Sequence, residues 1–60
     1  MSDKYDLMKK LENIFSYVKI GNRSHKVLND GINIINELLE KGFINGKQQE
    51  ELYFKLLFLI

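Results

Sequence analysis

The sequence contains no cysteine, no proline and only one histidine, His25. Without cysteine the chain cannot form a disulfide, and one histidine is too few for a zinc site built from cysteine and histidine. Two of the usual means of stabilising a domain of fewer than about 70 residues are therefore excluded. Good helix packing and association with another chain remain.

A large excess of charge of either sign is also lacking. The formal net charge is +1, too small for the long-range field typical of proteins that bind nucleic acid or anionic membranes. The charge is unevenly divided, because residues 1–26 sum to +3 and residues 27–60 sum to −2. The first half of the chain is mildly basic.

No segment predicts secretion or a membrane span. The first ten residues, MSDKYDLMKK, have no apolar run after a basic start, so we expect a cytoplasmic protein. The apolar run at the end, ELYFKLLFLI, is interrupted by Lys55 and is about half as long as the roughly 20 residues that cross a bilayer. We therefore expect no membrane span.

What the sequence does have is helical periodicity. Its 60 residues, 45% apolar and 28% charged, are typical of one globular domain, residues 1–60, and glycines divide that domain into three segments. The first segment repeats apolar residues with helical spacing, at Leu7, Leu11, Ile14 and Val18. The second carries its apolar residues between 27 and 39 on one face. We predict an all-α domain with helices at residues 3–20, 24–41 and 46–58.

The junctions between these segments contain residues that begin and end helices. Gly21 and Gly42 follow the first two helices, where a left-handed backbone conformation closes a helix. The expected capping residues are Ser24 or Asn22 for the second helix and Asn45 with Gln48 for the third. Gly31 lies inside the second helix, where it costs about 1 kcal/mol relative to alanine, so we expect another helix backbone to approach it closely.

The third segment is apolar on nearly all sides of its last two turns. Its expected core face consists of Leu52, Leu56, Leu59 and Ile60, widened by Tyr53 and Leu57. Phe54 and Phe58, one helical turn apart, lie on the opposite side beside Glu50 and Glu51. A helix of this kind must be buried on more than one side, and leaving both phenylalanines exposed would forfeit about 1.5–3 kcal/mol each.

A second copy of the chain is the preferred cover for this side. Dimers with a two-fold axis are the commonest oligomers, so we predict a helical-bundle homodimer formed through the third helix. A groove on a different protein, which binds helical anchors one turn apart, is the alternative. The predicted interface residues are Leu52, Tyr53, Phe54, Leu57, Phe58 and Ile60.

Three other interpretations of the last segment stay open. Its final turn could bend, so that Phe54 and Phe58 fold under the core of the same chain. Its aromatic content also suits a strand, although the chain offers no partner strand. Finally, the apolar end could lie on a membrane surface.

The residue types that carry enzyme chemistry are scarce. Ser24 and His25 are adjacent, but neighbouring residues at a helix start point away from each other, and a chain of 60 residues has little room for a substrate pocket. We predict a protein that is not an enzyme, with no catalytic residue, no metal site and no cofactor.

Cations gather between the first two helices, at Lys19, Arg23, His25 and Lys26. Backbone amides and cations at a helix start can hold a phosphate, so the alternative function is a small nucleic-acid-binding transcriptional regulator that uses residues 19–26. However, the third helix is acidic at its start and apolar at its end, unlike the recognition helix of a helix-turn-helix protein. Nucleic-acid binding is therefore the second choice.

Two surface features are weaker signals. Asn29, Asn33 and Asn36 form a polar stripe on the second helix, which we interpret as ordinary solvated surface. Tyr5 and Tyr17 lie off the main face of the first helix and suit the rim of an interface.

Together these patterns predict a small protein-interaction module that binds and modulates another protein, most simply as an inhibitor. The size of the chain and its many isoleucine, lysine and asparagine residues suit a regulator encoded by a bacterium or a phage.

Overall fold

The computed structural model describes residues 3–58. Within them are the helices α1 (Asp3–Lys19), α2 (His25–Glu40) and α3 (Gly46–Phe58), and no strand. The predicted all-α fold of three helices is confirmed, and each helix begins and ends within one residue of its predicted bounds. The strand interpretation of the last segment is therefore wrong. Leu59 and Ile60, both expected in the core, lie outside the described residues.

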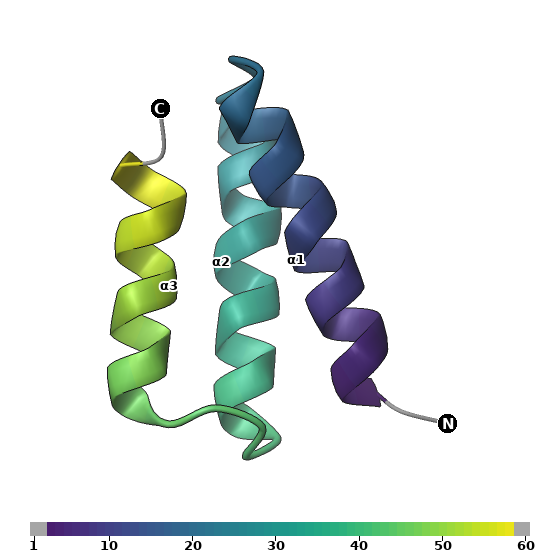
Figure 1. The fold of residues 1–60 in the computed structure, drawn as a ribbon, viewed down its shortest axis with the longest axis vertical. Helices are drawn as coiled ribbons and strands as arrows, with labels where there is room; N and C mark the ends of the chain where they lie inside the picture. The colour runs from purple at the N-terminus through teal and green to yellow at the C-terminus, as the bar shows by residue number, and fades with distance from the viewer. Residues whose placement is uncertain (1–2, 59–60) are drawn as a thin grey trace.

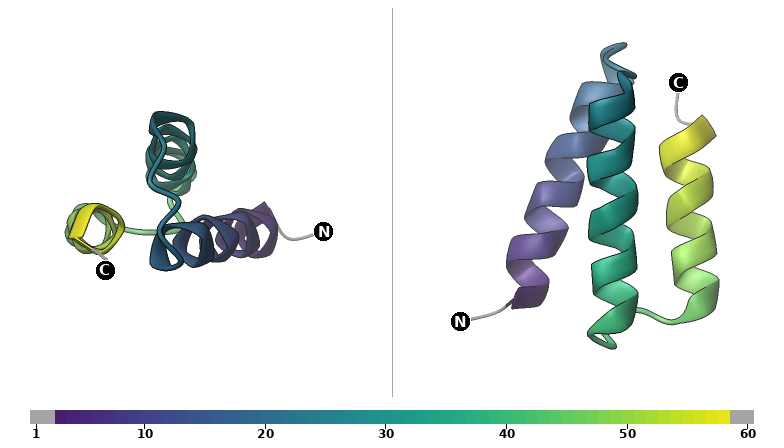
Figure 2. Two further views of the ribbon diagram at one scale, coloured as in Figure 1. Left: turned by 90° about the horizontal axis from the view of Figure 1, so that it is seen from above. Right: turned by 180° about the vertical axis from the view of Figure 1, so that it is seen from behind.

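The central helix of the bundle is α2 (Figure 1). α3 lies beside it and runs in the opposite direction, whereas α1 is tilted, so that its first turns diverge from α2. Seen from above, the three helices occupy the corners of a triangle (Figure 2). The connection between α1 and α2 lies at the same end of the bundle as the end of α3. The connection between α2 and α3 lies at the other end.

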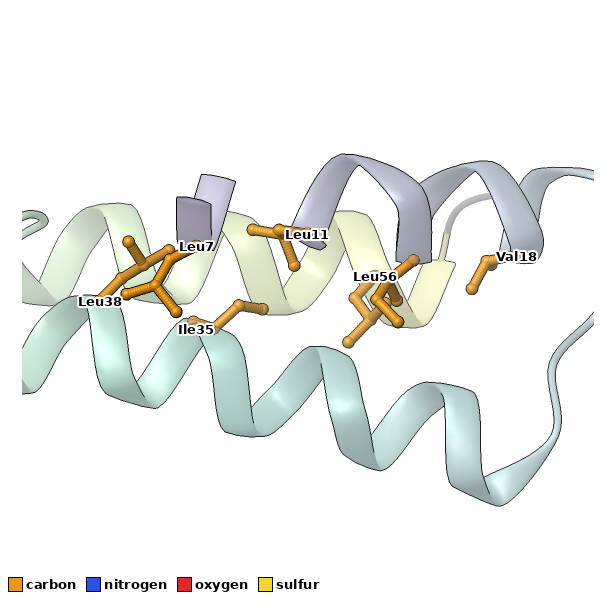
Figure 3. Close-up of a cluster of buried hydrophobic side chains, with 7 residues drawn as sticks. Leu7, Leu11, Val18, Ile35, Leu38 and Leu56 are labelled. Atoms are coloured by element: carbon orange, nitrogen blue, oxygen red, sulfur yellow. The ribbon is translucent and has the colours of Figure 1, made fainter. Parts of the chain in front are cut away.

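The core is one cluster of apolar side chains enclosed by the three helices (Figure 3). Its buried members are Leu7, Leu11, Ile14 and Val18 from α1, Ile35 and Leu38 from α2, and Leu56 from α3. Each such side chain stabilises the fold by about 1.5–3 kcal/mol relative to its exposed state. The core residues predicted for the first helix are all among them, which confirms that part of the prediction.

Gly31 is buried in α2 where α1 and α3 both pack against it. A Cβ atom at this position would lie 2.8 Å from Leu56 Cδ2 and 3.0 Å from Ile14 Cγ2. The close approach is therefore present, but side chains make it, and the expectation of a helix backbone was wrong. The missing side chain of Gly31 leaves the space that the leucine and the isoleucine fill.

A glycine with a left-handed backbone follows both α1 and α2, as predicted. Gly21 has a φ angle of 102° and Gly42 one of 79°. After α2, the amide of Phe43 donates to the Leu38 carbonyl at 2.9 Å, and the equivalent bond after α1 is 2.8 Å long. These bonds belong to the Schellman motif, which satisfies carbonyls left open by the helix itself. Phe43 also packs against the core, which fixes the direction of the chain as it leaves α2.

The second and third helices begin with side-chain caps. The Ser24 hydroxyl accepts a hydrogen bond from the Val27 amide at 3.3 Å, so Ser24 is the cap of α2. Before α3, the Gln48 amide donates to Asn45 Oδ1 at 2.8 Å and the Asn45 amide donates to Gln48 Oε1 at 2.9 Å. This reciprocal pair is a capping box, as the sequence predicted. It sets where α3 starts, and therefore which of its side chains face the core.

Candidate interaction surface

α3 presents two apolar sides, and the bundle covers one of them. Leu56 is fully buried in the core, whereas Phe54 and Phe58 on the other side are 57% and 67% exposed. The predicted division of this helix into a core side and an uncovered aromatic side is confirmed. The alternative in which the last turn bends to bury both phenylalanines is wrong.

The two exposed rings form one surface with Leu57. The ring centroids of Phe54 and Phe58 are 5.8 Å apart and their planes differ by 27°, a stacked arrangement that keeps both rings on the same side of the helix. Leu57 is 43% exposed, although it was expected to widen the core face. Because it follows Leu56 by one position, or about 100° of helix rotation, its side chain turns away from the core. We call Phe54, Leu57 and Phe58 the α3 outer patch.

The remaining predicted interface residues lie elsewhere. Leu52 is half-buried against the core, and Ile60 is outside the described residues. The hydroxyl of Tyr53 donates to Asn36 Oδ1 on α2, and Gln49 Nε2 donates to the same oxygen at 2.9 Å. Tyr53 therefore joins α3 to α2 within the chain.

The weaker surface signals do not form a common site. Of the asparagine stripe, Asn36 bonds to α3, Asn33 lines a shallow hollow between α1 and α2, and Asn29 is exposed. Tyr17 lines the same hollow as Asn33 and is 48% exposed, and Tyr5 is 64% exposed on the first turns of α1. The stripe is thus divided between packing roles and open surface.

Arg23, from the connection between α1 and α2, reaches the end of α3. Its Nη2 atom donates to the Leu57 carbonyl at 2.6 Å. A cation at this position satisfies a carbonyl that the helix leaves open and opposes the negative end of the helix dipole. This role of Arg23 was not predicted from the sequence, because the two residues are 34 positions apart and no local pattern links them.

The other predicted cations surround Arg23 at this end of the bundle. Lys19 is the last residue of α1 and His25 the first of α2, and both are exposed. Lys26 Nζ lies 3.4 Å from Asp30 Oδ2, one turn further along α2. Exposed pairs of this kind are weak, so the ammonium still contributes to the positive charge of this end.

α1 and α3 meet at a contact between Lys55 and Phe15. The Lys55 ammonium lies over the Phe15 ring, 5.2 Å from its centroid. Lys55 also lines two shallow hollows, one with Phe15 and Lys19 and the other with Met8 and Leu52. Such a cation–π contact is worth about 0.5–1 kcal/mol at an exposed site, so Lys55 helps to hold α3 against α1.

Within residues 3–58, no three histidine, aspartate or glutamate side chains are grouped closely enough to hold a metal ion. The Ser24 hydroxyl is used as a helix cap, and it accepts a hydrogen bond in that role. None of the helices in this part of the chain combines the length and the apolar character that crossing a membrane requires.

No family model, curated protein or solved structure matches this chain. The function proposed for it therefore rests on its own residues. The most distinctive of them are those of the α3 outer patch, because they are large, apolar, mutually stacked and exposed.

Proposed function

We propose that the chain is a non-enzymatic protein-interaction module that forms a homodimer through the α3 outer patch and, as a dimer, binds and modulates another protein. The observation that supports self-association is the exposure of Phe54 and Phe58, 57% and 67%, on a helix whose opposite side already completes the core. Neither ring is needed to complete the core of the single chain. Their free energy of burial is available to a partner instead.

The size of the patch sets the expected affinity. Fully covered aromatic side chains bury about 150–250 Å² each, so the α3 outer patch offers roughly 300 Å² of apolar surface. A standard interface buries about 800 Å² on each partner, so the patch would form the apolar centre of an interface completed by polar neighbours. We expect a dissociation constant on the order of micromolar.

A second copy of the chain is the proposed occupant. Two rings spaced one turn apart on one helix can interleave with the same two rings on an identical helix, which is the self-complementarity that a two-fold interface requires. The capping box and the contacts of Tyr53 and Lys55 hold α3 in place before the partner arrives. Little ordering cost is then added at association.

Sedimentation velocity at several concentrations tests the proposal. The wild-type chain should pass from monomer to dimer near micromolar concentration, and the double variant Phe54→Ser with Phe58→Ser should stay monomeric. The matched control is Tyr5→Ser with Tyr17→Ser, which removes two exposed aromatic residues from α1. The control should dimerise like the wild type. A wild-type chain that remains monomeric at about millimolar concentration would refute self-association.

Nucleic-acid binding through residues 19–26 has less support. Arg23, the central cation of that region, donates to the Leu57 carbonyl, and Lys26 lies beside Asp30. If the region did bind DNA, the affinity would fall steeply with salt and would fall again in Arg23→Ala. Fluorescence anisotropy with labelled duplex DNA at low salt measures this directly, and we expect no binding.

A further inference from the structure

The two ends of the bundle carry opposite net charge. The end that holds the connection between α1 and α2 and the last turns of α3 comprises residues 12–32 and 53–58. It has four cations, Lys19, Arg23, Lys26 and Lys55, and two anions, Glu12 and Asp30, a net charge of +2. The other end, residues 3–11 and 33–52, has five cations and six anions, a net charge of −1. The charge of the bundle is therefore separated along the axis of α3, negative at the start of this helix and positive at its end.

The α3 outer patch lies at the positive end, and the acidic residues of α3 lie just before it. Glu50 and Glu51 are exposed and precede Phe54 by one turn. The guanidinium of Arg23 lies at the other side of the patch, 2.6 Å from the Leu57 carbonyl. Along the exposed surface of α3, the order is thus acidic, aromatic, basic.

We propose that the two copies pair with their α3 helices antiparallel, so that Glu50 and Glu51 of each copy face the basic connection of the other. This inference rests on the proposed dimer and adds its orientation. A two-fold axis near residue 56 places Phe54 of one copy against Phe58 of the second copy. By the same symmetry, at a rise of 1.5 Å per residue, both glutamates lie about 5 Å past Phe58 of the second copy along the helix axis, on the side where Arg23 of that copy lies, with Lys19 and Lys26 nearby.

A parallel pairing reverses these relations. It would place Glu50 and Glu51 next to the same residues of the second copy, and it would bring two ends of charge +2 together. Both contacts are repulsive, whereas the antiparallel pairing makes two attractive contacts by symmetry. The aromatic patch supplies the attraction in either case, so the charges select the orientation.

Charge reversal tests this selection. The variant Glu50→Lys with Glu51→Lys should raise the dissociation constant of the dimer about tenfold, and Lys19→Glu with Lys26→Glu should do the same. An equimolar mixture of the two variants should form a heterodimer in preference to either homodimer, because both contacts of the mixed pair are then attractive. The control is Glu37→Lys with Glu40→Lys on α2, which changes the net charge equally and should leave the affinity within about twofold of the wild type.

A distance measurement tests the orientation independently of affinity. The chain has no cysteine, so Lys47→Cys accepts a single nitroxide label on the exposed start of α3. With a rise of 1.5 Å per residue, antiparallel helices that cross near residue 56 separate the two labels by roughly 25–30 Å. Parallel helices would hold them within about 15 Å, close to the usual distance between packed helices.

The outcomes separate this inference from the proposed function. A long label distance with preferred heterodimer formation supports both. A dimer that depends on Phe54 and Phe58 but shows a short label distance overturns the antiparallel orientation and keeps the dimer. A chain that is monomeric, or a dimer unaffected by the loss of both phenylalanines, overturns the proposed dimer and the orientation with it.

Discussion

α2 and α3 have similar numbers of apolar residues in proportion to their length, but they use them differently. α2 is central, and its apolar side chains are buried or half-buried against α1 and α3, with no large apolar residue exposed. α3 buries Leu56 fully and leaves Phe54, Leu57 and Phe58 exposed. A helix at the edge of a three-helix bundle needs one apolar side. The second apolar side of α3 is not needed to complete the core of one chain, and this excess is the basis of the proposed dimer.

The largest expected difference is between two substitutions on α3 itself. Leu56→Ala should lower the free energy of unfolding by about 2–5 kcal/mol, because it leaves a cavity in the core of a small domain. Phe54→Ala should change it by less than about 1 kcal/mol, because that ring is 57% exposed. Urea unfolding, at a protein concentration below the dissociation constant of the proposed dimer, gives both free energies. Equal losses would mean that the two sides of α3 do not differ as described.

The next contrast is between two glycines. Gly31→Ala should destabilise the chain by about 1 kcal/mol, because overpacking against Leu56 and Ile14 exceeds the gain in helix propensity. Gly46→Ala, at the start of α3, should be neutral or stabilising, because no atom lies within 4 Å of its added Cβ. Thermal unfolding of both variants measures the difference. If Gly31→Ala were more stable than the wild type, the side chains of Leu56 and Ile14 must shift to accommodate the added methyl group.

A smaller effect should distinguish the two ends of α3. Arg23→Ala removes the hydrogen bond to the Leu57 carbonyl, so amide exchange in the last turn of α3 should accelerate and stability should fall by about 0.5–1 kcal/mol. Exchange near the capping box at the start of α3 should stay the same. Lys26→Ala, which removes an exposed pair with Asp30, is the matched control and should leave both ends unchanged. If the amides in the last turn of α3 exchanged at the same rate in Arg23→Ala and in the wild type, Arg23 would not cap this helix.

Much of the fold could be predicted because its signals are local. Glycines after the helix ends, a serine cap and the reciprocal pair of Asn45 and Gln48 act within five residues, and the structure contains each of them. The spacing of the apolar residues in α1 likewise identifies its core face without knowledge of the other helices. The exposure of Phe54 and Phe58 followed from the same helical geometry.

The features that could not be predicted depend on contacts between distant segments. The bond of Arg23 to the Leu57 carbonyl and the bond of Tyr53 to Asn36 require the relative placement of two helices, which periodicity does not supply. Gly31 was expected to meet a helix backbone, but the side chains of Leu56 and Ile14 fill its space. Whether a residue at the edge of an apolar face is buried also depends on the neighbouring helix, as Leu57 demonstrates.

The most direct test of the central claim is a dilution series followed by NMR, with the phenylalanine rings labelled with ¹³C. The chain has four phenylalanines, and Phe15 and Phe43 pack against its own core. On dilution from about 1 mM to about 1 μM, across the expected dissociation constant, the ring signals of Phe54 and Phe58 should shift while those of Phe15 and Phe43 stay constant. Four sets of signals that remain unchanged over the whole range would contradict the claim that a second copy covers the α3 outer patch.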